Sequence, residues 1–169
     1  VTIFVSGTIS LVSDTVMEGS SIGVAFLILL LIIFVGIVFD IIGMAVATAD
    51  EKPFHSMASR KVPGAQEAIR LLRNAERVSS ICNDVIGDIC GVVAGSASAT
   101  VASQLLVRIE LAWPKAVVLI LSALVAGLTV GGKAIGKTFA VNSCTTIVHS
   151  VGKLIHSLGM FPKLFSKKK

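Results

Sequence analysis

The stretch IGVAFLILLLIIFVGIVFDIIGMAVATA, residues 22–49, decides the fold of this chain. Between Glu18 and Asp40 lie 21 uncharged residues. That length crosses about 30 Å of hydrocarbon at roughly 1.5 Å per helical residue. The apolar pattern continues beyond Asp40 to Ala49. We therefore expect a long, tilted membrane-spanning helix that carries a carboxylate within its apolar length.

Two further apolar stretches complete the expected fold. One covers about residues 79–105, where Gly87, Gly91 and Gly95 recur every four residues. Small residues at this spacing let helices approach closely in lipid, so this helix is expected to be the central, buried one. The other stretch runs over about residues 116–132. Because 54% of the residues are hydrophobic and only 15% are charged, we predict an all-α integral membrane protein with three transmembrane helices.

Amphipathic segments accompany these spans. Residues 65–77 and 139–158 place apolar side chains on one helical face and polar side chains on the other. This pattern is typical of interfacial helices that lie in the plane of the membrane surface. We expect an extracytoplasmic N-terminal segment over residues 1–21, a three-helix transmembrane domain with juxtamembrane helices over 22–160, and a basic cytoplasmic tail over 161–169.

Positive charge predicts the orientation. Lysine and arginine number six in residues 50–77 and seven in residues 133–169, whereas residues 1–21 contain none. The positive-inside rule then places the N-terminus outside and the C-terminus in the cytoplasm of a plasma membrane. The expected partner of this charge is the lipid bilayer and not a nucleic acid, because nucleic-acid readers present a soluble basic face.

Charged side chains occur where a membrane disfavours them. Asp40 interrupts the first span, Asp84 and Asp88 open the second, and Lys133 and Lys137 close the third. Charge at bilayer depth is costly unless it is paired or hydrated, so these residues are candidates for a functional site. Their distances from the basic loops place all of them in the inner half of the membrane.

Oxygen ligands near these positions suggest a cation site. Carboxylate, amide and glycine-flanking backbone oxygens bind hard cations such as Mg²⁺, with another divalent cation or Na⁺ as alternatives. The predicted metal ligands are Asp40, Asn83, Asp84 and Asp88, and the other site residues are Gly87, Gly132, Lys133 and Lys137.

Two alternatives to a transport site stay open. The acids and lysines could neutralise one another as a structural network that holds the helices together. Lys133 could neutralise the site, which would give a non-transporting structural or regulatory subunit. An enzyme is not expected, because the sequence has no nucleophile–base arrangement, P-loop or dinucleotide fingerprint.

The motifs also resemble a known family. The segment DIIGMAVATADEKPFHSMASRKVPGAQEAIRLLRNAERVSSICND (40–84) is similar to the first half of the DUF21 transmembrane domain of the CorC/cyclin M magnesium transporters. Within it, GAQEAIRLLRNAER (64–77) matches the interfacial helix of that family. GGKAIGKTFAV (131–141) resembles the motif GExxPKTxA, and the likeness covers roughly residues 22–160. It implies a homodimer in a bacterial membrane that binds Mg²⁺ among its helices.

This chain departs from the family pattern at charged positions. The serine of the family motif SGxETA falls at Asp40 and its glutamate at Gly43. The glutamate of GExxPK falls at Lys133, whereas Lys137 keeps the family lysine. The family adds nucleotide-binding CBS domains, and this chain resembles only the membrane part, so its partner could be a full-length transporter or another membrane protein.

Overall fold

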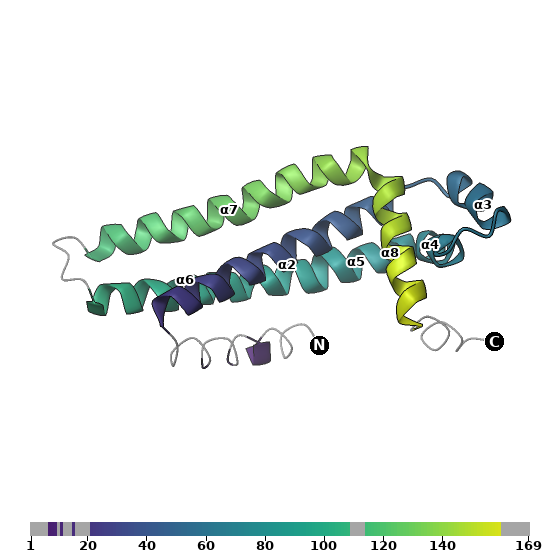
Figure 1. The fold of residues 1–169 in the computed structure, drawn as a ribbon. Helices are drawn as coiled ribbons and strands as arrows, with labels where there is room; N and C mark the ends of the chain where they lie inside the picture. The colour runs from purple at the N-terminus through teal and green to yellow at the C-terminus, as the bar shows by residue number, and fades with distance from the viewer. Residues whose placement is uncertain (1–6, 10, 12–14, 16–20, 109–113, 160–169) are drawn as a thin grey trace. The chain divides into compact units, whose positions relative to one another are not determined.

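The computed structural model describes residues 7–9, 11, 15, 21–108 and 114–159, and this part of the chain is helical with no strand (Figure 1). The expected basic tail over residues 161–169 lies outside the described residues, as does most of the segment 1–21. The helices are α2 (Ile22–Thr48), α3 (Lys52–Ser59), α4 (Ala65–Arg73), α5 (Ala75–Ser80), the π-helical segment η1 (Ile81–Gly87), α6 (Asp88–Arg108), α7 (Pro114–Asn142) and α8 (Cys144–Leu158).

Three helices are long and apolar enough to cross a membrane. They comprise Ile22–Thr48, Ala75–Leu106 and Lys115–Asn142, and we refer to them as the candidate spans. The third candidate span is longer than expected, because α7 does not end at Gly131–Gly132 but continues through Lys133 and Lys137. The all-helical class and the number of candidate spans are therefore confirmed.

The amphipathic segments begin and end at backbone irregularities. The predicted helix over residues 65–77 ends at Arg73, because Asn74 leaves helical geometry and its Nδ2 donates to the carbonyl oxygen of Arg70. The residues that follow belong to the second candidate span instead. Similarly, the segment expected to begin at residue 139 begins as α8 at Cys144, because Ser143 is not helical.

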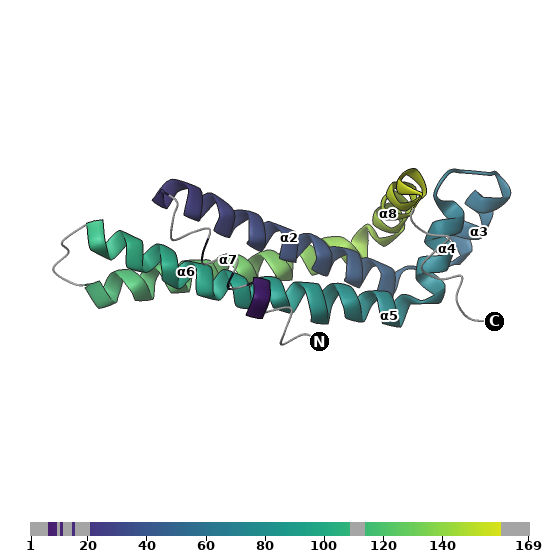
Figure 2. The same ribbon diagram turned by 90° about the horizontal axis from the view of Figure 1, so that it is seen from below.

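The chain divides into two compact units. The first contains residues 1–39 and 84–135, and the second contains residues 40–83 and 136–169. In the first unit, parts of α2 and α7 pack with α6 (Figures 1 and 2). The core contains Ala25, Leu29 and Ile33 of α2, Ala94, Ala97 and Val101 of α6, and Val125 of α7.

The second candidate span is the most enclosed of the three. About 44% of an 18-residue apolar segment of this span is buried, compared with 22% for the first span and 6% for the third. This order agrees with the prediction from its small residues. However, Gly91 and Gly95 do not make the close contacts expected of them, since nothing that the structure describes lies within 4 Å of a Cβ built on either.

Other glycines allow the helices of the first unit to approach. A Cβ added at Gly36 of α2 would lie 2.9 Å from the Cβ of Cys90 on α6. A Cβ at Gly132 of α7 would collide with the side chain of Ile37 on α2. Small residues therefore permit close helix contact, as expected in lipid, but at different positions from the predicted stripe.

In the second unit, parts of five helices enclose a separate apolar core that includes Ala140 of α7. Phe54 of α3 is fully buried and packs with Val46 of α2, Leu72 of α4 and Val148 of α8. The apolar face of α4 is therefore covered by protein. This differs from the interfacial helix expected from the sequence, which would bury that face in lipid.

Helices α4 and α8 approach each other through two glycines. The carbonyl oxygen of Gly64 lies where a Cβ of Gly152 would stand, and the backbone nitrogen of Lys153 lies 2.5 Å from a Cβ built on Gly64. Gly64 also has a φ of +85°, a conformation that glycine adopts without steric cost. The junction between these helices is therefore specified by backbone geometry.

Candidate functional site

The predicted site residues are distributed over both compact units. The second unit contains Asp40, Asn83 and Lys137. The first unit contains Asp84, Gly87, Asp88, Gly132 and Lys133.

A π-helical turn contains several of these residues. The segment Ile81–Gly87 includes Asn83, Asp84 and Gly87, and Asp88 follows as the first residue of α6. In a π-helix the hydrogen bonds run from i to i+5, which inserts an extra residue into the turn. Such segments are rare and occur frequently at functional sites, so the helix is irregular at the position where the sequence predicts chemistry.

Asp40 is the buried carboxylate among the described residues. Only 5% of its surface is exposed, although it lies within the apolar length of α2. The other buried polar residue in the described part of the chain is Ser98, whose hydroxyl donates to the backbone oxygen of Gly95. Asp84 and Asp88, by contrast, are exposed. Burial therefore distinguishes Asp40 from the other two predicted carboxylate ligands.

Gly43 brings the face of α2 that carries Asp40 against the π-helical segment. A Cβ at Gly43 would overlap the Oδ1 atom of Asn83 and would lie 3.0 Å from the Cβ of Cys82. Asp40 precedes Gly43 by three residues and therefore shares its face. This close approach requires a glycine and places the amide of Asn83 against the backbone of α2.

The side-chain amide of Asn83 is held at one end only. Its Nδ2 donates to the hydroxyl oxygen of Ser79 over 3.2 Å. Its Oδ1 is buried and accepts no hydrogen bond from the residues that the structure describes. A buried acceptor that lacks a donor is costly, and such atoms are therefore uncommon. An amide oxygen of this kind is a suitable ligand for a hard cation.

Lys133 makes a different contact in the first unit. Its Nζ donates to the carbonyl oxygen of Gly87 over 3.3 Å, which connects α7 to the end of the π-helical segment. The sequence predicted that backbone oxygens beside glycine would bind a metal. Here one of those oxygens binds an ammonium group of the chain itself.

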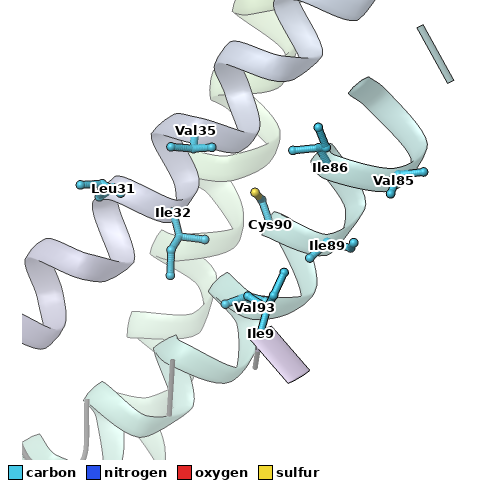
Figure 3. Close-up of a pocket in the computed structure, with 9 residues that line it drawn as sticks. All are labelled: Ile9, Leu31, Ile32, Val35, Val85, Ile86, Ile89, Cys90 and Val93. Carbon is cyan, nitrogen blue, oxygen red and sulfur yellow. The ribbon is translucent and has the colours of Figure 1, made fainter. Parts of the chain in front are cut away.

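A cavity of ≈ 340 Å³ also lies in the first unit, between α2 and the helix formed by η1 and α6 (Figure 3). Its wall includes Ile32 and Val35 of α2, Ile86 and Cys90 opposite them, and Ile9. Every residue that lines it is apolar, so it offers no oxygen ligand for a cation.

The structure shows no grouping of three or more His, Cys, Asp or Glu side chains that could hold a metal in the described part of the chain. Amide and backbone oxygens also bind hard cations. A cation bound beside Asp40 would therefore need Asn83, backbone oxygens or water to complete its coordination, as is common for Mg²⁺.

One polar contact in the second unit was not predicted from the sequence. Nδ1 of His156 on α8 lies 3.0 Å from Oε1 of Glu67 on α4. Burial would raise the pKa of Glu67, but the hydrogen bond and charge of His156, with help from Arg70, hold the pKa of this carboxyl below 4.5. The two residues lie 89 positions apart on separate polar helix faces, so neither spacing nor motif indicates the pair.

The described fold is thus that of an all-helical chain with three candidate membrane spans. Comparison with protein-family models, with curated proteins and with solved structures finds no match.

Proposed function

We propose that this chain is the membrane domain of a divalent-cation transporter, with Mg²⁺ as the expected cargo. The observation that carries the proposal is the burial of Asp40 in an apolar helix whose face packs on Asn83. Ionisable residues in membrane helices are costly and commonly mark ion pathways. The three candidate spans and the irregular helix at Asn83 support the same conclusion.

In this proposal, Asp40 and Asn83 supply oxygen ligands in the second unit. The carboxylate of Asp40 provides negative charge, and the buried Oδ1 of Asn83 provides a neutral donor. Asp84 and Asp88 are a separate pair of candidate carboxylates in the first unit, where their exposure favours the capture or release of a cation. Hard cations such as Mg²⁺ take oxygen ligands of these kinds.

The proposal includes insertion in a plasma membrane as a homodimer, with the N-terminus outside. The asymmetry of lysine and arginine along the sequence supports the orientation. The likeness of the motifs to the CorC/cyclin M transporters supports the dimer, the bacterial membrane and Mg²⁺. Exposed apolar side chains on α7, among them Leu124 and Leu128, are suited to contact with lipid or with a second copy.

Thermal unfolding in detergent tests the cation site. Mg²⁺ that binds the folded state stabilises it by about 2.7 kcal/mol at 100 times its Kd. Asp40→Asn should remove most of this stabilisation, whereas Glu76→Gln, on an exposed residue of α5, should leave it unchanged. Equal Mg²⁺ stabilisation of the native protein and of Asp40→Asn would refute the assignment of Asp40 as a ligand.

A second candidate function is a non-transporting structural or regulatory membrane subunit. It is favoured by the contact from Lys133 to the carbonyl of Gly87, because an ammonium there replaces a cation with a fixed charge of the chain. Under this alternative, Lys133 neutralises acidic groups permanently and no ion moves. Purified protein in liposomes would then be folded and dimeric, with a Mg²⁺ flux equal to that of empty vesicles.

A further inference from the structure

The second unit contains a polar contact between two helices outside the candidate spans. His156 lies in the last turn of α8, and its Nδ1 is 3.0 Å from Oε1 of Glu67 in the first turn of α4. Only 15% of the Glu67 side chain is exposed, compared with 56% for His156. A cavity of ≈ 250 Å³ is lined by the pair itself, by Gln66 of α4, and by Lys61 and its neighbours in the turn between α3 and α4.

Much of the remaining α4–α8 junction consists of apolar and backbone contacts. Val148 and Gly152 of α8 are buried, and Gly152 packs on the carbonyl of Gly64. These contacts extend along α8 to Gly152, whereas Leu154 and Leu158 nearer its C-terminal end are exposed. The hydrogen bond from His156 is therefore well placed to hold the last turns of α8 on α4.

We propose that His156 and Glu67 form a pH-sensitive contact that holds the C-terminal turns of α8 against α4. An ionised carboxylate only accepts hydrogen bonds, so Nδ1 of His156 must carry the shared hydrogen. A second proton, taken from solvent at the other ring nitrogen, converts this bond into a charge-assisted one, which is about twice as strong. Histidine is the side chain that ordinarily gains this proton between about pH 8 and 5.

Three basic residues belong to the same junction. They are Lys61 in the turn, Arg70 of α4 and Lys153 of α8. His149 of α8 is a second histidine at this junction, with its Nε2 3.3 Å from the carbonyl oxygen of Pro63. Since a carbonyl carries no ionisable charge, protonation of His149 should change that contact less than protonation of His156 changes the pair with Glu67.

The direction of the pH effect follows from the chemistry of the two partners. An imidazole that gains a proton beside an ionised carboxylate holds it more strongly, so the attachment of α8 should strengthen as pH falls toward about 5.5. At lower pH Glu67 becomes protonated, and because its pKa lies below 4.5 the contact is lost only in that more acidic range. The attachment should therefore be strongest at about pH 5 to 6, independently of any cation transport.

Hydrogen–deuterium exchange of the full chain in detergent tests this inference. The readout is the protection of a peptide covering residues 152–158, corrected for the intrinsic exchange rate at each pH. In the native protein we expect protection to be roughly two- to fivefold higher at pH 5.5 than at pH 7.5, the range for an exposed ion pair. Glu67→Gln and His156→Gln should each abolish this ratio.

His149→Gln is the matched control, because it changes the other histidine of the same helix and should keep the ratio. Equal protection of the native peptide at the two pH values would overturn the proposal. The same holds if the ratio survives in Glu67→Gln or disappears in His149→Gln. Protection of the peptide Ala65–Arg73 of α4, measured in the same samples, shows that each variant remains folded.

Discussion

The ammonium group of Lys133 donates a hydrogen bond to the carbonyl oxygen of Gly87, 46 residues earlier in the chain, over 3.3 Å. This contact joins α7 to the final residue of the π-helical segment. A backbone oxygen at a helix irregularity can accept either a metal ion or a protonated amine. Whether Lys133 regulates a cation site or replaces it therefore distinguishes the two candidate functions.

Replacing Lys133 by methionine separates these functions. If Lys133 competes with a cation, Lys133→Met should strengthen Mg²⁺ binding, seen as a larger rise in Tm at a fixed Mg²⁺ concentration. The shape of the side chain is largely retained, so packing should change little. Lys115→Met is the control, because Lys115 is exposed on the same helix and is not one of the predicted site residues. If Lys133→Met gains no response to Mg²⁺ and the native protein shows no Mg²⁺ flux, the non-transporting subunit is favoured.

Gly43 should not tolerate a side chain. A Cβ at this position would overlap Oδ1 of Asn83 and lie 2.8 Å from its Cγ, so Gly43→Ala should destabilise the protein by about 1–3 kcal/mol. Gly95→Ala is a matched control, because a Cβ there meets nothing within 4 Å and should stabilise the helix by roughly 0.5–1 kcal/mol. Unfolding midpoints in a denaturing detergent measure both effects, and equal midpoints would contradict the close approach.

Gly152 should be equally sensitive in the other helix pair. Alanine at this position would collide with the carbonyl of Gly64 and lie 3.1 Å from the backbone nitrogen of Ala68. Because rigid backbone atoms cannot easily move, α8 should separate from α4, with a loss of about 1–3 kcal/mol. Limited proteolysis should then cleave α8 faster than in Gly127→Ala, whose added Cβ meets nothing described. Equal cleavage rates would show that the two helices do not pack as described.

Acid should weaken the second unit through Glu67. The pKa of this carboxyl lies below 4.5, so its stabilising contribution is present above that pH and is lost as pH falls through the lowered pKa. The pair is partly exposed to solvent, so the effect should stay under about 1 kcal/mol. Between pH 5.5 and 3.5 the native protein should lose more stability than Glu67→Gln, measured as the change in Tm. An identical loss of stability in both proteins would contradict the prediction that ionised Glu67 stabilises the second unit.

The sequence predicted the features that depend on hydrophobic pattern. Three apolar stretches of sufficient length indicated three spans, and the small residues of the second indicated that it would be the most enclosed. The apolar stretch on both sides of Asp40 also indicated that this carboxylate lies within a candidate span. Pattern is informative here because burial in lipid or protein depends on composition and helical period.

Other features depend on contacts that no local pattern encodes. The π-helical segment could not be predicted from the sequence. A π-turn contains one more residue than an α-turn, and no particular residue type marks that insertion. The stripe of Gly91 and Gly95 suggested close packing, yet Gly36 and Gly43 provide it, since the partner side chains decide where a missing Cβ is needed. The pair of Glu67 and His156 likewise requires two distant helices to meet.

The flux of Mg²⁺ into liposomes tests the central claim most directly, namely that the buried carboxylate of Asp40 serves cation transport. Vesicles that contain a Mg²⁺-sensitive dye and the native protein should take up the ion faster than empty vesicles. Those with Asp40→Asn should match the empty ones, while Glu76→Gln retains the native rate. Uptake by Asp40→Asn at the native rate, or no uptake by folded native protein, would contradict the account.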